Sequence, residues 1–140
     1  MLSAFDISVS GMVAQRIRLN AISSNIANIS STHNEDGEAT PYQPRHVIFQ
    51  TDDSVSAPHG AVGVVVASVE TSMIEPRWKY EPGHPDAIKE GPRAGYVAYP
   101  NIDLMTEFVN AMEATRAYEA NIGAIEVSKD LAKQTLRILA

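Results

Sequence analysis

Apolar residues recur with a helical period at the start of the chain. Leu2, Phe5, Val9 and Met12 follow one another at steps of three, four and three, and one heptad later Leu19, Ile22, Ile26 and Ile29 repeat these steps. Steps of three and four place side chains on one face of an α-helix. The pattern predicts a helix of about eight turns over residues 1–31.

A stricter repeat runs through residues 101–140. Steps of four and three alternate throughout the positions Leu104, Phe108, Ala111, Thr115, Tyr118, Ile122, Ile125, Lys129, Ala132, Leu136 and Leu139. A repeat of 3.5 residues is typical of a left-handed coiled coil. Asn101 or Asp103 can cap the start of this helix, and Lys133 with Arg137 suits its C-terminal dipole. We expect this seam, with Ile122 midway along it, to pack against the apolar face of the first helix.

Residues 32–100 differ from both ends because all eight prolines of the chain fall in this region. Proline interrupts helices, so no long helix is expected here. Short β-branched or aromatic segments stand between turn residues at 46–51, 61–70, 77–80 and 95–99. The sequence therefore predicts an α+β protein with three domains: an N-terminal helix (1–31), a small antiparallel β unit (32–100) and a C-terminal helix (101–140) that pairs with the first.

The polar positions of the first helix are occupied by serine, asparagine, glutamine and alanine more than by charged residues. A helix exposed to water normally carries charges opposite its apolar face. Small and amide side chains instead permit close approach of other helices and hydrogen bonding across an interface. We interpret the free faces of the two helices as contact surfaces for neighbouring subunits; an ordinary helical hairpin with a bland surface is the alternative.

Five short motifs follow one another along the chain. The first is "SSNIANISST" at 23–32, followed by "PYQPRHVIF" at 41–49, "EPGHPDA" at 81–87, "GYVAYPNIDLMTEF" at 95–108 and "EATRAYEAN" at 113–121. In this order they resemble the motifs of the axial proteins of the bacterial flagellum, and among these the C-type proximal-rod subunits. These motifs contain four signature amides: Asn25, Asn28, Asn101 and Asn121. The connector "IKEGPRA" at 88–94 is longer than expected for the family, and we expect it to tolerate substitution.

The resemblance implies a structural role in the basal-body rod, which carries torque from the membrane-embedded motor through the periplasmic space toward the hook. It also implies other rod subunits and the proteins that join the rod to the export gate as partners. Delivery would use the flagellar type III export apparatus without a cleavable signal peptide. A B-type rod or hook-related subunit and a soluble coiled-coil adaptor remain alternatives.

Other function classes find little support in the residues. The chain has no cysteine, which excludes disulfides and thiolate metal sites. Its histidines lack the i, i+4 spacing of a helical metal pair, and the "HPD" at 84–86 follows Pro82 and Gly83, which favours a turn. The net charge of −6 comes from the middle and the C-terminal part, without a basic stripe that could neutralise many phosphates. We therefore predict no enzyme, cofactor, metal, nucleic-acid partner or membrane span.

Overall fold

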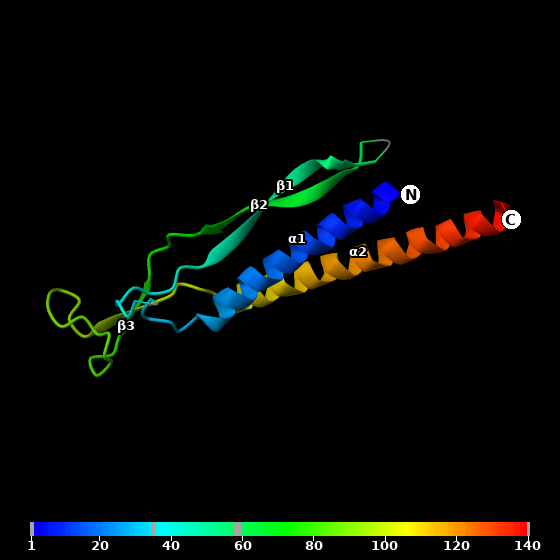
Figure 1. Ribbon diagram of the computed structural model, residues 1–140. Helices are drawn as coiled ribbons and strands as arrows, with labels where there is room; N and C mark the ends of the chain where they lie inside the picture. Colours follow the sequence, from blue (N-terminus) through cyan, green and yellow to red (C-terminus); the bar gives the residue numbers. More distant parts are fainter. Residues whose placement is uncertain (1, 35, 58–59, 140) are drawn as a thin grey trace.

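The computed structural model describes residues 2–34, 36–57 and 60–139, with the side chains of residues 2, 3 and 139 left out. Two long helices flank an antiparallel β region, which confirms the predicted α+β class. The elements in chain order are α1 (Leu2–Ala27), β1 (Arg45–Ser56), β2 (Val62–Thr71), β3 (Arg77–Tyr80), β4 (Tyr96–Tyr99) and α2 (Leu104–Leu139). α1 and α2 lie side by side and antiparallel, so both termini are at the same end of an elongated molecule (Figure 1).

α1 is shorter than predicted because it ends at Ala27. The Asn28 side chain donates to the Ser24 carbonyl oxygen at 2.9 Å and accepts a hydrogen bond from the Ser31 hydroxyl at 3.0 Å. Such local side-chain bonds to the backbone favour a turn over a further helical turn. Ile29 therefore lies in the turn that follows α1 and not on its apolar face.

The β region consists of two separate antiparallel pairs, β1 with β2 and β3 with β4. The β1–β2 hairpin pairs Arg45 with Thr71 and has two register shifts. The hairpin lies along α1, and α1 separates the hairpin from α2 over much of the hairpin's length (Figure 1). The β3–β4 pair lies at the opposite end from the termini. A two-stranded hairpin is marginal alone in water, so α1 supplies the surface on which β1 and β2 are stabilised. The division into three domains stays a prediction.

Ser10 and Gly63 fix the hairpin to α1. The Ser10 hydroxyl donates to the Ile7 carbonyl oxygen at 2.7 Å and accepts a hydrogen bond from the Val64 amide at 3.0 Å. Gly63 is buried at this contact, and a Cβ added to it would lie 2.9 Å from the Val55 Cβ and 3.0 Å from the Ser10 hydroxyl oxygen. Only glycine fits this close approach of strand and helix.

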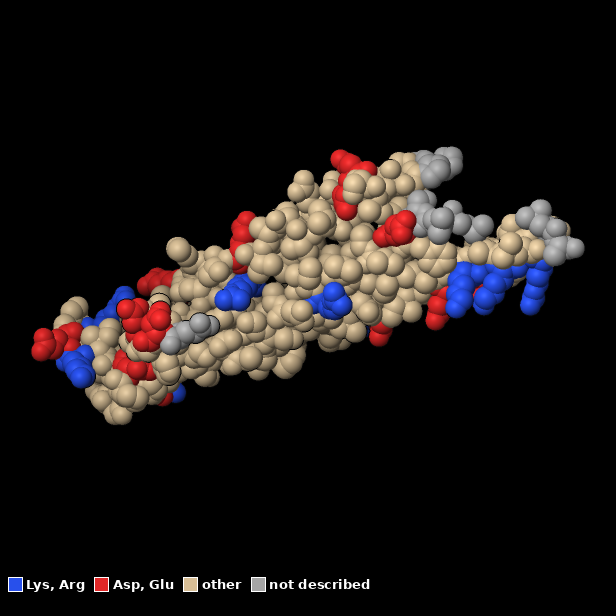
Figure 2. All heavy atoms as spheres, in the orientation of Figure 1, with Lys and Arg blue, Asp and Glu red and all other residues tan. Residues whose placement is uncertain are grey.

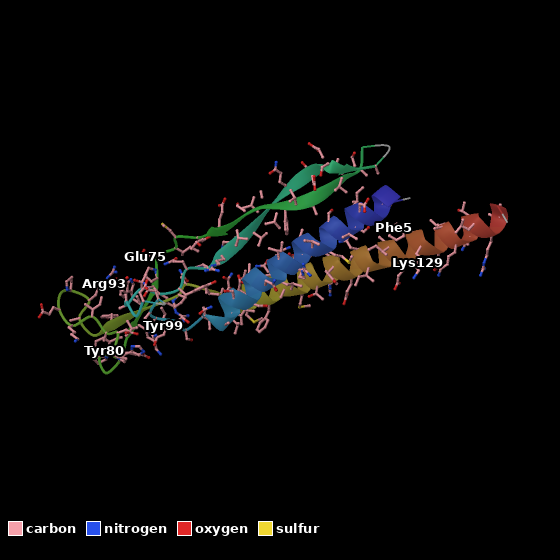
Figure 3. The ribbon with its side chains drawn as sticks, viewed as in Figure 1. Phe5, Glu75, Tyr80, Arg93, Tyr99 and Lys129 are labelled. Atoms are coloured by element: carbon pink, nitrogen blue, oxygen red, sulfur yellow. The ribbon has the colours of Figure 1, made fainter. Side chains whose placement is uncertain are left out.

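The far end of the molecule is held by aromatic stacking and polar contacts. The Arg93 guanidinium lies 4.4 Å from the centre of the Trp78 ring, and the Tyr99 hydroxyl donates to Glu81 at 2.7 Å. Figure 3 labels Arg93 and Tyr99 in this region, together with Glu75 and Tyr80. Arg93 therefore has a structural contact that the expectation of a tolerant 88–94 connector did not include.

The turn at 84–86 connects this end to the segment after α1. The Asp86 amide donates to His84 Nδ1 at 3.1 Å, which is the predicted turn, and the Thr32 hydroxyl donates to the Asp86 carboxylate at 2.6 Å. His33 Nδ1 lies 3.4 Å from the same carboxylate. The hydrogen bond from Thr32, reinforced by that with His33, lowers the pKa of Asp86.

Charged side chains gather toward the two ends of the molecule. Figure 2 shows acidic and basic residues together over the β3–β4 end, acidic residues near the tip of the β1–β2 hairpin, and basic residues beneath the last turns of α2. The surface between them carries few charges in this view.

We predict that Gly63→Ala destabilises the chain by about 1–3 kcal/mol, because the added methyl group forces β2 away from α1 and strains the Ser10 hydrogen bond. Urea unfolding followed by circular dichroism measures the change. Gly83→Ala is the control, since nothing lies within 4 Å of a Cβ added there. Equal stability of the two variants would contradict this view of the hairpin contact.

We predict that Asp86→Asn lowers the thermal midpoint near neutral pH and that the difference from the unsubstituted chain vanishes in acid. The folded state lowers the pKa of Asp86, so the ionised carboxylate stabilises the fold above its unfolded-state pKa. That stabilisation is lost as the pH falls through the lowered folded-state pKa. Thermal midpoints of both proteins between about pH 7 and pH 2 test this; a difference that does not depend on pH would refute it.

Candidate functional site

The face that α2 turns toward α1 keeps the predicted 3.5-residue period but is rotated from the predicted seam. Buried and half-buried positions on this face alternate at steps of four and three: Glu107, Ala111, Ala114, Tyr118, Asn121, Ile125, Ser128 and Ala132. Ala111, Tyr118, Ile125 and Ala132 were predicted. The other four predicted seam residues, Phe108, Thr115, Ile122 and Lys129, are exposed. In each case the residue one position earlier in the sequence faces α1 instead.

The rotation follows from the close approach of the two helices. A Cβ added to Gly11 would lie 2.9 Å from the Asn121 amide nitrogen, so the α1 backbone lies directly against this side chain. Ala14, Ala21 and Ala114 are buried along the helix pair. At the Gly11 contact no larger side chain fits between the backbones, whereas Tyr118 and Ile125 are half-buried elsewhere along the pair. Phe108 is 49% exposed and Ile122 is 39% exposed in the single chain, so neither is enclosed between α1 and α2.

The remaining seam residues are distributed over several surfaces. On α1, Ile22 is buried and lies beneath β1, and Val9 is exposed. Leu104 and Leu136 are exposed on α2, whereas the side chains of Leu2 and Leu139 lie outside the described residues. The others, Phe5, Met12, Leu19, Ile26 and Ile29, are partly buried. A role of these residues in assembly, and coiled-coil geometry of the pair, stay predictions.

Asn25 connects α1, β1 and α2 at one point. Its side chain is 1% exposed, and its amide nitrogen donates to the Arg45 carbonyl oxygen at 3.0 Å and to the Glu107 carboxylate at 3.1 Å. Its amide oxygen accepts hydrogen bonds from the Arg45 amide at 2.8 Å and the Tyr42 hydroxyl at 3.0 Å. A carboxamide has two donors and two acceptor lone pairs, so Asn25 uses its full capacity. This signature amide has a defined structural role.

Glu107 is the buried charge of this junction, with 6% of its surface exposed. It lies in the first turn of α2, where the helix dipole favours a negative charge. The start of α2 is capped by Asp103, which accepts hydrogen bonds from the Met105 amide at 3.2 Å and from the Thr106 hydroxyl at 2.7 Å. The bond from Thr106 lowers the pKa of Asp103. Asp103, rather than Asn101, is therefore the cap.

The side chains of Asn101 and Asn121 each donate a hydrogen bond to a backbone carbonyl oxygen. Asn101 donates to the Glu75 carbonyl oxygen at 3.2 Å, which holds the start of the α2 segment against the chain between β2 and β3. Asn121 donates to the Ala117 carbonyl oxygen at 2.8 Å and packs against Gly11. All four amides thus shape the backbone or the helix contact.

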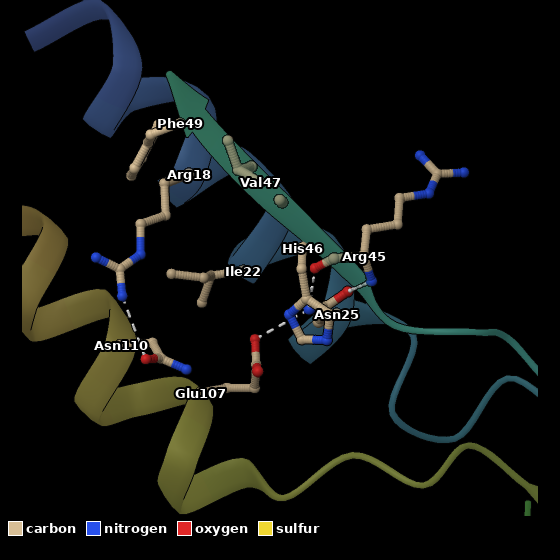
Figure 4. Close-up of a pocket in the computed structure, with 10 residues that line it drawn as sticks. Arg18, Ile22, Asn25, Arg45, His46, Val47, Phe49, Glu107 and Asn110 are labelled. Atoms are coloured by element: carbon tan, nitrogen blue, oxygen red, sulfur yellow. Dashed lines mark hydrogen bonds between the residues drawn. The ribbon is translucent and has the colours of Figure 1, made fainter. Parts of the chain in front are cut away.

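A cavity of about 350 Å³ lies between α1, α2 and β1, next to the Asn25 junction (Figure 4). The Arg18 guanidinium reaches across it from α1 to Asn110 at 3.3 Å and to Glu113 at 3.2 Å on α2. Its lining residues are Arg18, Ala21, Ile22, Asn25, Arg45, His46, Val47, Phe49, Glu107 and Asn110. The polar groups that line it fix the two helices and the first strand relative to one another.

Sequence reasoning did not identify Glu107, Tyr42 or the Thr32–Asp86 pair. Glu107 lies inside the motif at 95–108, and its position in the first turn of a helix was visible in the sequence. Its burial was not, because only the fold brings it within reach of Asn25. Among the residues that the structure describes, no group of three or more histidine, aspartate or glutamate side chains is placed to hold a metal ion. No described helix is long and apolar enough to cross a membrane.

Comparison with known proteins places the two helical regions in flagellar rod families. Residues 5–34 match the family described as "Flagella basal body rod protein", and residues 93–138 match "Flagellar basal body rod FlgEFG protein C-terminal". The flagellar basal-body rod protein FlgC of Salmonella typhimurium strain LT2 is 42% identical over 139 residues, covering 99% of this chain and 97% of the relative. The chain belongs to the FlgC family of flagellar basal-body rod proteins.

More distant organisms give the same result. FlgC of Borreliella burgdorferi is 37% identical over 152 residues, with 99% of this chain and 97% of the relative covered. FlgC of Aquifex aeolicus is 36% identical over 137 residues, with 96% and 94% covered. The prediction of a structural subunit of the flagellar basal-body rod is therefore confirmed, and the choice of FlgC over other axial families is confirmed with it.

We predict that Asn25→Asp destabilises the chain by about 3 kcal/mol near neutral pH. The substitution removes both donors and places a second carboxylate beside buried Glu107, where an uncompensated charge is costly. Urea unfolding followed by circular dichroism near neutral pH measures the change.

The matched control is Asn20→Asp, on the exposed side of α1, with an expected change within about 0.5 kcal/mol. A destabilisation of Asn25→Asp no larger than that of the control would show that the junction does not hold the fold together.

Proposed function

We propose that this chain self-assembles into the proximal rod through the outer faces of its terminal helices and transmits motor torque along the rod toward the hook. The observation that carries the proposal is the unpartnered apolar face at the start of α2. Met105 is 69% exposed, and Phe108, Val109 and Met112 are about half exposed on consecutive turns. Exposed apolar patches of this kind mark surfaces that bind other proteins.

A groove beside this face gives it a shape that another helix can enter. An open groove of about 480 Å³ lies along α2 and is lined by Phe108, Ala111, Met112, Thr115, Arg116 and Glu119. An apolar groove of this kind is suited to helix-in-groove binding. Other rod subunits are the partners that we infer for it.

The antiparallel helix pair suits a mechanical role. α2 has 36 residues and α1 has 26, and the two are joined by the Asn25 junction, the Arg18 contacts and the Gly11 contact along their length. A helix pair tied at several points resists bending and twisting more than a single helix. We infer that stacked pairs of this kind carry torque, and that the chain is not an enzyme.

The family also guides the proposed route and position of the protein. We infer that it occupies the periplasmic part of the basal body and reaches it through the flagellar type III export apparatus. Proteins at the junction of the rod with the export gate are the proposed partners at one end, and further rod subunits are the partners at the other.

We predict that Phe108→Asp and Ile122→Asp abolish incorporation into the rod but leave the isolated chain folded. Phe108 is 49% exposed and Ile122 is 39% exposed in the single chain, so an aspartate at either position reaches water and the isolated chain stays folded. In an assembled helix interface the same charge would be buried, at several kcal/mol. Recovery of each variant in purified basal bodies and swimming in soft agar are the measurements.

The control is Glu126→Gln, at an exposed position of α2, which should assemble normally. Normal recovery of both aspartate variants would eliminate this face as an assembly surface. Absence of the unsubstituted chain from basal bodies would favour the soluble coiled-coil adaptor instead.

A further inference from the structure

Three basic residues lie along one side of the last turns of α2. Lys129, Lys133 and Arg137 are spaced at i, i+4 and i+8, which places them on one face of the helix, and all three are exposed. Their side chains point away from α1 and from the hairpin in Figure 2, and Figure 3 labels Lys129 among them. We name these three residues the cationic edge. Lys133 also contacts Asp130 of the same helix at 3.2 Å.

Exposed apolar side chains accompany the cationic edge. Because Gly11 faces Asn121 in an antiparallel pair, α2 residues beyond about position 130 extend past the start of α1. Leu131 and Leu136 are exposed there, and Ile138 is 84% exposed. These last turns of α2 are therefore both basic and apolar, and α1 does not cover them.

An acidic surface occupies the opposite flank at the same end of the molecule. Asp52 pairs with Gly63 in the hairpin, next to the contact between Ser10 and Val64, and Asp53 follows it. Asp6 lies one turn before Ser10 on α1, and both Asp6 and Asp53 are exposed. We name Asp6, Asp52 and Asp53 the acidic flank. Figure 2 shows acidic atoms near the hairpin tip on one side, and on the other side the basic side chains with acidic atoms next to them.

We propose that the cationic edge of one copy docks on the acidic flank of a second copy that lies beside it and points in the same direction. This inference rests on the proposed function and specifies a contact within it. Because Gly11 faces Asn121, Asp6 lies level with about residue 126 of α2, and the cationic edge extends beyond that level toward the C-terminus. A parallel copy that lies beside the first and is displaced along the long axis therefore brings opposite charges together. Because they lie on opposite flanks, one copy cannot satisfy its own charges in this way.

The geometry of this contact explains how a single chain extends an assembly. The two surfaces are different, so the contact is heterologous and each copy keeps one free surface of each kind. Heterologous contacts produce rings or helical filaments. Exposed ion pairs contribute little affinity, so the apolar side chains at 131, 136 and 138 provide burial while the charges set the direction and level of the neighbour.

Cross-linking tests the contact, since the chain contains no cysteine and single thiols can be introduced freely. Basal bodies are purified from cells that express a chain with both Lys133→Cys and Asp53→Cys. The purified basal bodies are then treated with a short bismaleimide. We expect dimers and higher multimers of this chain alone, identified by mass spectrometry. The control pair is Lys89→Cys with Asp53→Cys, because Lys89 is exposed at the far end of the molecule, and it should give no multimers.

A second variant tests whether charge guides the contact. Lys129→Glu with Arg137→Glu, added to the first cysteine pair, should lower the multimer yield about tenfold, equivalent to ~1.4 kcal/mol. Undiminished cross-linking in this variant, no multimers from the first pair, or adducts with a different rod protein only would each overturn the proposal. The unsubstituted chain must be recovered in basal bodies, and its absence would refute the proposed function itself.

Discussion

The close approach of α1 and α2 is the constraint on which the rest of the structure depends. Gly11 lies against Asn121, and Ala14, Ala21 and Ala114 are buried along the same pair. At the Gly11 contact the backbones leave room for small side chains only, while Tyr118 and Ile125 are half-buried elsewhere along the pair. Phe108 and Ile122 of α2 are turned outward and contribute to the exposed face that we propose for other subunits. The inner packing and the outer surface therefore have one cause.

Burial of polar groups has to be matched by hydrogen bonds, and the Asn25 junction meets this requirement. A buried amide without partners would cost about 1–3 kcal/mol, whereas Asn25 bonds to Arg45, Tyr42 and Glu107. These partners belong to β1, the segment before it and α2. One side chain of α1 therefore determines where three other parts of the chain lie, and the junction specifies a single arrangement of the helix pair and hairpin.

The uncharged character of α1 has the same explanation. α1 contacts α2 on one side and the β1–β2 hairpin on another, through Gly11 and Arg18 in the first case and Ser10 in the second. Charged side chains on either side would have to be buried, at a high cost in desolvation. Serine, asparagine and alanine permit both contacts. The hairpin thus covers part of the surface that the sequence pattern had suggested for neighbouring subunits.

The sequence by itself determined the order of elements, the two long helices with their periods, the antiparallel β region between them and membership of the rod family. These properties follow from local spacing, proline positions and short motifs. Only the tertiary structure decided which face of α2 turns toward α1, that the hairpin packs on α1, and that Glu107 is buried beside Asn25. A heptad pattern predicts that the positions with the largest apolar residues form the interface. The distance between two helices, however, depends on the residues of both helices. Because Gly11 and the alanines of α1 allow close contact, Ala114 and Asn121 face α1 in place of Thr115 and Ile122, together with the larger Tyr118 and Ile125. The pattern of α2 alone does not reveal this choice of face.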